Sequence, residues 1–305
     1  MKTQTTKWKR VSKQHPCPVC QKSDWCMVTD DAVLCMRVES QKPAKSGGWI
    51  HPLNETAAAS WDRVPVQKKQ ERTDQELDAI WRPRAERWRE QGRGEVGRLA
   101  VILGVNVAAL GELGAGWEGR SWTFPERNAA GLILGVSRRF EDGTKRCAVG
   151  SRRGLTYSDG WIERDGPVLI VEGASDTAAG ITLGLAVIGR PSNVGGLKLL
   201  VKLFVSVKRT VIVLGERDRK PHESLPAILR RDHDPRCRGC PKCWPGCFGA
   251  RKLAACLNRA LSGKVLVRML PDEVKDLRAW LNARQIDVGN PEACWMAGKD
   301  LLCQI

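Results

Sequence analysis

The sequence has no apolar run approaching the roughly 20 residues that a membrane-spanning helix requires. Its first ten residues, MKTQTTKWKR, are basic but lack the apolar core of a signal peptide. The motifs Gly-x4-Gly-Lys-[Ser/Thr], Gly-x-Ser-x-Gly and His-Glu-x-x-His are also absent. We therefore expect a cytoplasmic protein with no membrane partner, no fused P-loop helicase, and neither serine-hydrolase nor zinc-protease chemistry.

Acidic residues are few: 34 Asp and Glu stand against 50 Lys and Arg, so the net charge is +16. A chain this basic is typical of proteins that bind a polyanion. No basic amphipathic helix with an aromatic apolar face is visible, which favours nucleic acid over a membrane surface. The 305 residues, 42% of them hydrophobic, suffice for about two globular domains.

Twelve cysteines in a chain expected in the cytoplasm indicate metal binding rather than disulfides, and eight of them form two tight clusters. The first cluster is Cys17-x2-Cys20-x5-Cys26-x8-Cys35. Four thiolates complete a tetrahedral Zn²⁺ site and leave no open position, so this zinc is expected to be structural. His15 is an alternative ligand.

Cations and tryptophans surround the first cluster, and together they suit single-stranded nucleic acid, because cations bind phosphates and aromatic rings stack on bases. The alternative for two of the tryptophans, Trp25 and Trp49, is that they form the module's small core. The residues concerned are Lys7, Lys9, Arg10, Lys13, Arg37, Lys42 and Lys45, with Trp8, Trp25 and Trp49.

The second cluster, Cys237-x2-Cys240-x2-Cys243-x3-Cys247, has the spacing of a ferredoxin-type iron–sulfur run, and it also suits a second zinc. His233 could replace Cys247 as the fourth ligand. Nothing else in the chain suggests electron transfer, so zinc is favoured. The four remaining cysteines are scattered and are expected to pack as small hydrophobic residues.

The hydrophobic pattern predicts an α/β protein. In the first half we expect helices over residues 74–91 and 99–110, then a hairpin of strands 131–140 and 145–149. From residue 168 onward strands and helices alternate, which predicts a parallel sheet covered by helices. The expected helices of this half are 174–185, 197–205, 249–261 and a final helix 272–284, and short strands are expected at 186–188 and 264–268.

Two aliphatic runs end on carboxylates. Val168-Leu-Ile-Val is followed by Glu172, and Val211-Ile-Val-Leu-Gly is followed by Glu216-Arg-Asp218. The carboxyl ends of neighbouring parallel strands form the crevice in which ligands bind. Three carboxylates in one place repel one another unless a hard cation such as Mg²⁺ or Mn²⁺ lies between them. The sequence therefore predicts a metal site suited to phosphoryl chemistry.

These motifs carry a resemblance to a known family. The run ending in Glu172-Gly173 and the strand ending in Glu216-Arg-Asp218 resemble the Toprim domain of bacterial-type primases, topoisomerases and some nucleases. The hairpin of residues 131–149 and the segment Gly150-Ser-Arg-Arg-Gly-Leu155 resemble the basic half of the primase core in phage primase-helicases. A zinc module ahead of that core is also the primase order. The chain thus resembles Toprim primase-like proteins of phages and mobile elements.

The resemblance implies a domain order. We expect a zinc-binding nucleic-acid module at 1–55, a linker at 56–72, the basic part of a primase core at 73–165 and a Toprim domain at 166–305. The Toprim domain would carry a Cys-rich insertion at 233–247.

The resemblance also implies an activity, the synthesis of short RNA primers on single-stranded DNA from ribonucleoside triphosphates, beside a separate helicase. Glu172, Glu216 and Asp218 would hold Mg²⁺ or Mn²⁺, although Glu216 stands where the family usually has Asp. Alternatives are a Toprim nuclease and a catalytically degenerate DNA-binding replication protein. The expected nucleotide or template contacts are Lys145, Arg152, Arg153, Arg138 and Arg139.

Overall fold

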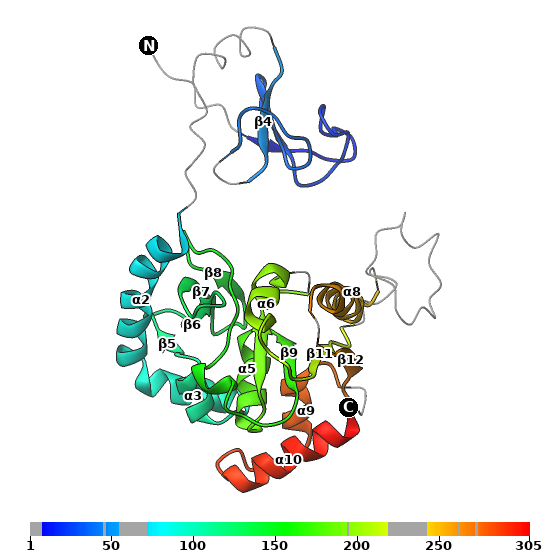
Figure 1. The fold of residues 1–305 in the computed structure, drawn as a ribbon. Helices are drawn as coiled ribbons and strands as arrows, with labels where there is room; N and C mark the ends of the chain where they lie inside the picture. Colours follow the sequence, from blue (N-terminus) through cyan, green and yellow to red (C-terminus); the bar gives the residue numbers. More distant parts are fainter. Residues whose placement is uncertain are drawn as a thin grey trace. The chain divides into compact units, whose positions relative to one another are not determined.

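The computed structural model describes residues 8–44, 47–54, 72–193, 195–218, 243–261, 263–271 and 274–305. The chain divides into two compact units, residues 1–71 and 72–305 (Figure 1). Residues His233, Cys237 and Cys240 of the second cysteine cluster lie outside the described residues, as do residues 56–71 of the expected linker.

The first unit contains a small antiparallel sheet in the order β1-β2-β3-β4. Its buried core consists of Val11 and Val33 together with three of the clustered cysteines. A core of this size stabilises little by hydrophobic burial alone, so the cysteines must contribute to the stability of the fold. The strands are β1 (Lys9–Arg10), β2 (Met27–Val28), β3 (Ala32–Cys35) and β4 (Trp49–Pro52).

The second unit begins with helix α2 (Asp74–Gln91), which confirms the helix expected there. A capping box fixes its start, because Thr73 Oγ1 accepts from the backbone of Glu76 while the Glu76 carboxylate accepts from the backbone of Thr73. The single helix expected over 99–110 is wrong. Gly104, with φ of +66°, ends α3 (Arg93–Leu103), and Asn106 caps a separate helix, α4 (Val107–Glu112).

An antiparallel sheet in the order β5-β6-β7-β8 follows and contains the expected hairpin. Its outer face packs on α2 through a cluster that includes Trp81 and Leu134. Leu155, after the last strand, pairs with Arg127 through backbone hydrogen bonds and carries the chain away from this sheet. The strands are β5 (Gly116–Trp117), β6 (Trp122–Arg127), β7 (Ile133–Arg139) and β8 (Lys145–Cys147).

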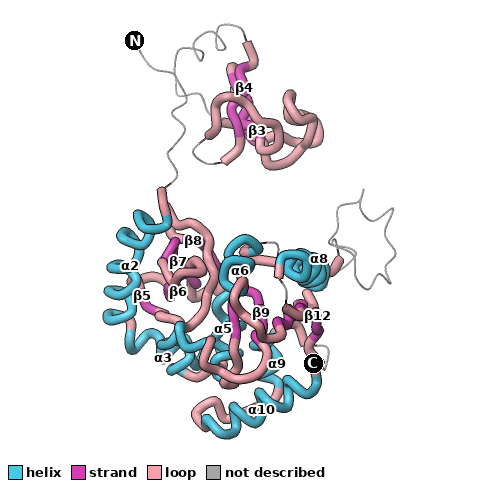
Figure 2. Tube along the Cα trace, in the orientation of Figure 1, coloured by secondary structure: helices cyan, strands magenta, loops and turns pink. Residues whose placement is uncertain are grey.

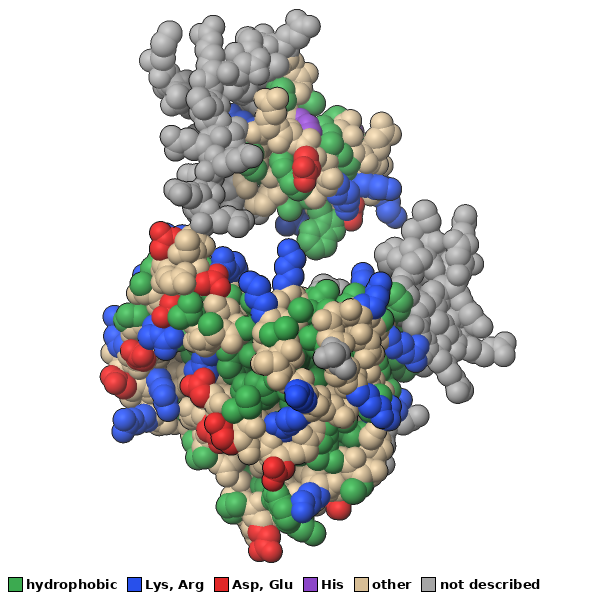
Figure 3. Space-filling view, viewed as in Figure 1, with side chains coloured by type: hydrophobic (Ala, Val, Ile, Leu, Met, Phe, Trp, Pro, Cys, Tyr) green, Lys and Arg blue, Asp and Glu red, His purple; other side chains and the backbone are tan. Residues whose placement is uncertain are grey.

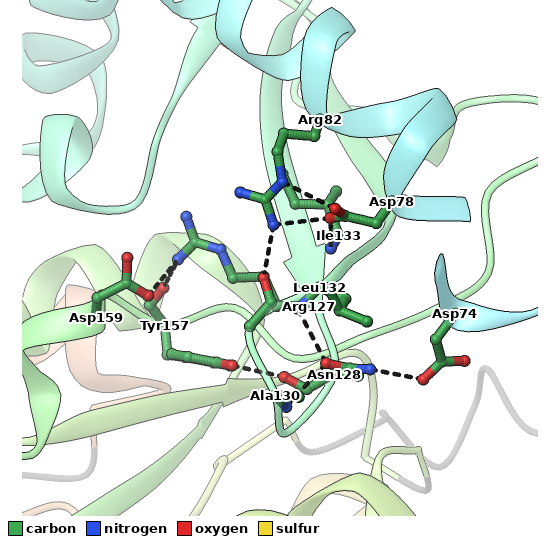
Figure 4. Close-up of polar contacts among 11 residues, drawn as sticks. Asp74, Asp78, Arg82, Arg127, Asn128, Ala130, Leu132, Ile133, Tyr157 and Asp159 are labelled. Atoms are coloured by element: carbon green, nitrogen blue, oxygen red, sulfur yellow. Dashed lines mark hydrogen bonds and ion pairs between the residues drawn. The ribbon is translucent and has the colours of Figure 1, made fainter. Parts of the chain in front are cut away.

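Asn128 organises the turn between β6 and β7 (Figure 4). Its Oδ1 accepts two backbone N–H groups of the turn at 2.9 and 3.0 Å, and its Nδ2 donates to Asp74 on α2 at 2.6 Å. Asp78, one helical turn further along, accepts from the backbone N–H of Ile133 at 2.6 Å. These bonds fasten α2 to the start of β7, and β7 leads into the candidate site.

The rest of the unit is a four-stranded parallel sheet in the order β10-β9-β11-β12, which confirms the expected alternation of strands and helices. Its strands are β9 (Val168–Glu172), β10 (Val187–Arg190), β11 (Val211–Gly215) and β12 (Val265–Met269). Its helices are α5 (Gly173–Thr182), α6 (Leu197–Phe204), α8 (Pro245–Ala260), α9 (Leu277–Ala283) and α10 (Pro291–Gln304).

The helices cover both faces of this sheet (Figure 2). Alternate strand residues point to opposite faces, so Val168 and Ile170 pack with α6 and α8, whereas Leu169 and Val171 pack with α5 and α9. The expected final helix starts later than residue 272, at Leu277, and the additional helix α10 was not anticipated.

Candidate active site and zinc centre

The four cysteines of the first cluster come together as expected. Their Sγ atoms all lie within 4.8 Å of one another, and three of the four residues are buried. Burial raises the pKa of Cys26 to about 12. For Cys20 burial acts in the same direction, but hydrogen bonds from the backbone of Lys22 and from neighbouring thiols outweigh it and lower its pKa to about 7.

An all-sulfur set that is this compact fits tetrahedral Zn²⁺, which keeps all four thiols ionised. Arg37 adds a positive charge beside the cluster. Its Nη1 lies 3.9 Å from the sulfur of Cys20 and 3.8 Å from that of Cys26, and its Nη2 pairs with Asp24 at 2.8 Å. A guanidinium in this place offsets the negative charge of a metal bound by four thiolates.

Two tryptophans of this unit differ in their surroundings. Trp25 is 75% exposed, so it is not part of the core, whereas Trp49 is half-buried and pairs with Cys35 in the sheet. A shallow groove of about 410 Å³ runs beside Trp8, Met27 and Lys42. This unit therefore presents aromatic rings next to cations on its surface.

A pocket of about 310 Å³ lies between the antiparallel sheet and the carboxyl end of the parallel sheet. The acids that line it are Glu126, Glu172, Asp176, Glu216 and Asp276. The cations that line it are Arg138, Arg139, Lys145, Arg146, Arg153, Lys275 and Arg278. Strands β9 and β11 are direct neighbours, which is why Glu172 and Glu216 meet here.

The acids of the pocket disfavour one another's ionisation. Burial raises the pKa of Glu216 to about 8, with repulsion from Glu172, Asp176 and Asp276 as the next causes. Burial followed by repulsion from Asp276 raises the pKa of Asp176 as well. A divalent cation would relieve this repulsion.

The donors fit a Mg²⁺ ion that keeps part of its water. Among the described residues, the four cysteines form the one group of three or more Cys, His, Asp or Glu that could hold a metal ion by themselves, so the carboxylates of the pocket would share an ion with water. Mg²⁺ commonly takes one or two carboxylates and several waters. Glu172 offers such a carboxylate in the pocket wall, and its buried Oε2 has no hydrogen-bond partner in the described part of the chain.

Asp218, the third expected acid, lies beside this pocket rather than in its wall. Its Oδ1 accepts a hydrogen bond of 2.9 Å from the backbone N–H of Gly246 at the start of α8. Burial raises the pKa of Glu172, and the charge of Asp218 acts in the same direction. Asp218 is therefore near the other two acids while it caps a helix.

The expected cations divide into four groups. Arg139 and Lys145 line the pocket and have no ion pair within 4 Å among the described residues; burial and the charge of Arg278 lower the pKa of Arg139. Arg138 also lines the pocket and pairs with Glu118 at 3.0 Å. Arg152 points elsewhere and bonds Asp74.

Arg153 links the two sheets. Its Nε donates to the buried carboxylate of Glu126 on β6 at 2.9 Å, and its Nη2 donates to the carbonyl of Pro191 after β10 at 2.7 Å. Glu126 gave no signal in the sequence, because its strand Trp122-Thr-Phe-Pro-Glu-Arg127 mixes aromatic and polar residues and is not an aliphatic run that ends in an acid. Asp276 could have been found, since it follows a strand of the same parallel sheet.

The second cysteine cluster is described only in part. Cys243 and Cys247 are buried, and Cys247 lies in the first turn of α8.

Lys and Arg side chains are spread over the visible face of the 72–305 unit (Figure 3). No helix in the described ranges is long and apolar enough to cross a membrane.

No family model and no curated protein matches the chain. Similar solved structures include a DnaG catalytic core (14% identity, 72% of this chain and 79% of that chain, TM-score 0.49). An Aquifex aeolicus primase with zinc-binding and RNA polymerase domains shows 13% identity over 79% and 65% of the two chains, with a TM-score of 0.48. The primase fragment of the bacteriophage T7 primase-helicase shows 16% identity over 92% and 97%, with a TM-score of 0.40.

Proposed function

We propose that this chain is a DNA primase that synthesises short RNA primers on single-stranded DNA with a Mg²⁺- or Mn²⁺-dependent Toprim site. One observation carries the proposal: a single pocket joins acids at the ends of β9 and β11 to Arg139 on β7 and Lys145 on β8, which have no ion pair among the described residues. Nucleotide polymerisation needs both, because a metal–triphosphate complex presents a cation and a polyanion together.

In this reaction a 3′-hydroxyl attacks the α-phosphate of the incoming ribonucleotide, and pyrophosphate leaves. Glu172 and Glu216 would hold the divalent cation. When bound, this cation would neutralise the negative charge that develops on the phosphate. Arg139 and Lys145 would bind the triphosphate. Arg153, held by Glu126, would keep the two walls of the pocket at a fixed separation.

The zinc module would bind the single-stranded DNA template. Lys9 and Arg10 on β1 are exposed, as is Trp25, so phosphate binding and base stacking are available on the same unit. The expected linker at 56–72 would join this module to the core. We place the protein in the cytoplasm as a mobile-element or phage-type enzyme that works beside a separate helicase.

The test is incubation of the full-length protein with single-stranded DNA, labelled ribonucleotides and Mg²⁺ or Mn²⁺. Short labelled oligomers are expected, and they should vanish in Glu172→Gln, which keeps the shape of the side chain but removes its charge. The exposed Glu163, which does not line the pocket, provides the control variant Glu163→Gln with unchanged synthesis.

Shortened DNA in that assay would support a Toprim nuclease instead, and DNA binding without either product would support a degenerate replication protein. Metal analysis of the same sample should give one equivalent of zinc for the first cysteine cluster, and a second equivalent if Cys237, Cys240, Cys243 and Cys247 also bind zinc.

A further inference from the structure

A buried arginine, Arg190, lies next to Glu172. Arg190 is the last residue of β10, and its side chain is 1% exposed. In the parallel pairing of β10 with β9 it stands opposite Glu172. Glu172 lines the pocket and Arg190 does not, so the guanidinium approaches Glu172 from the protein interior.

The guanidinium of Arg190 makes one hydrogen bond among the described residues and leaves two of its nitrogens without a partner there. Its Nη1 donates to the carbonyl of Asn193 at 2.5 Å, but its Nε and Nη2 are buried and have no hydrogen-bond partner among the described residues. Nη2 lies 3.8 Å from Glu172 Oε2, which is likewise buried and without a hydrogen-bond partner there. Two opposite charges thus face each other just beyond hydrogen-bond distance.

Burial of a guanidinium is costly unless a charge compensates it. A packing role is poorly served by Arg, because an aliphatic side chain would fill the same space without that cost. The nearby charge that compensates Arg190 is Glu172, and Glu216 also acts on it. Both are acids to which we assign the divalent cation.

We propose that Arg190 is a positioning residue that holds Glu172 in place and, as a fixed counter-charge, weakens the binding of divalent cations to the empty pocket. The inference rests on the proposed function, in which Glu172 binds that cation. Seven Lys and Arg side chains also line the pocket, but Arg190 differs from them because it is buried and faces the Glu172 carboxylate from the interior. Because Arg190 offsets the charge of Glu172, a divalent cation binds weakly to the pocket alone. It binds firmly when the triphosphate contributes further oxygen ligands and negative charge.

The direction of the expected effect separates this role from a structural one. Arg190→Met removes the competing charge, so the zinc-loaded full-length protein should bind Mn²⁺ about tenfold more tightly, measured as loss of the free Mn²⁺ signal in electron paramagnetic resonance. Arg190→Lys should stay near the wild-type affinity. Damage to the fold would instead weaken Mn²⁺ binding.

Two further comparisons sharpen the test. Arg164→Met removes a positive charge that pairs with Glu112, away from the pocket, and should leave Mn²⁺ affinity unchanged. In a Glu172→Gln background, Arg190→Met should have a smaller effect, because the charge of Arg190 acts first on Glu172 and then on Glu216. If Arg190→Met does not fold, Arg190→Gln, which keeps a donor for the Asn193 carbonyl, takes its place.

Unchanged or weaker Mn²⁺ binding in the folded Arg190 variant would overturn the inference, even if primers are made. Tighter binding without any primer synthesis by the wild-type protein would support the role of Arg190 and refute the primase. In an active primase, Arg190→Met should lower both the half-saturating Mg²⁺ concentration and kcat.

Discussion

At the scale of single residues, Glu216 makes stability depend on pH. Its pKa rises from 4.5 to about 8 in the folded chain, through burial and then repulsion from neighbouring acids. Between these values the folded chain holds a proton that the unfolded chain has released, so stability falls as the pH rises. We expect a loss on the order of 3 kcal/mol between pH 5 and pH 8 without divalent cations.

The measurement is urea unfolding at several pH values, without added Mg²⁺ or Mn²⁺, for the wild-type protein and Glu216→Gln. The variant cannot ionise at this position, so its stability should decline less over the same range. An equal decline in the two proteins would show that ionisation of Glu216 does not carry the effect. Saturating Mg²⁺ should reduce the decline in the wild-type protein, because the cation stabilises the ionised acids.

The sequence could place Glu172 and Glu216 in one site because each ends a recognisable aliphatic run. It could not reveal the role of Glu126, which lies in a strand of mixed aromatic and polar residues, or that of Arg190, which ends its strand as a cation rather than an acid. Their roles depend on Arg153 and Glu172, which lie 27 and 18 positions away along the chain and are brought close only by the sheets.

At the scale of elements, the start of α8 fixes the acid-x-acid segment. A Cβ atom added to Gly246 would lie 2.8 Å from both Asp218 Oδ1 and Glu216 Cβ, closer than such atoms approach. Gly246→Ala must therefore displace Asp218 or the helix start and weaken the hydrogen bond that caps α8. We expect a loss of about 1–2 kcal/mol in the free energy of unfolding and weaker Mn²⁺ binding.

Gly111→Ala is the matched control, because the added Cβ would meet no atom within 4 Å in helix α4. That variant should be as stable as the wild type or slightly more so, since Ala favours helix over Gly. Thermal unfolding and Mn²⁺ titration measure both effects. Wild-type behaviour of Gly246→Ala in both assays would mean that α8 does not position these acids.

Elements were predictable where local signals agreed. The parallel half followed from aliphatic runs and intervening helical segments, and α2 from its periodic apolar face. The break between α3 and α4 was missed because the apolar pattern continues across Gly104, and only its left-handed backbone ends the helix. Helix α10 was missed although Asn290 and Pro291 form an ordinary helix start.

At the scale of the whole molecule, the net charge of +16 should make binding of single-stranded DNA strongly salt-dependent. Each phosphate contact on a single strand contributes about −0.7 to the slope of log affinity against log salt concentration. Replacement of Lys9 and Arg10 by Ala should therefore make the slope shallower by about 1.4 if both bind phosphate.

Trp25 should behave differently, because stacking on a base releases no counterions. Trp25→Ala should weaken DNA binding by about 1–3 kcal/mol and leave the salt slope unchanged. The exposed Trp295 on α10 offers the control Trp295→Ala, with unchanged binding. Fluorescence anisotropy of labelled single-stranded DNA over a series of salt concentrations yields both quantities. A change of slope in Trp25→Ala, or an unchanged slope in the Lys9 and Arg10 variant, would contradict this division of roles. If both results hold, the unit of residues 1–71 contacts the strand through charge and stacking that act independently.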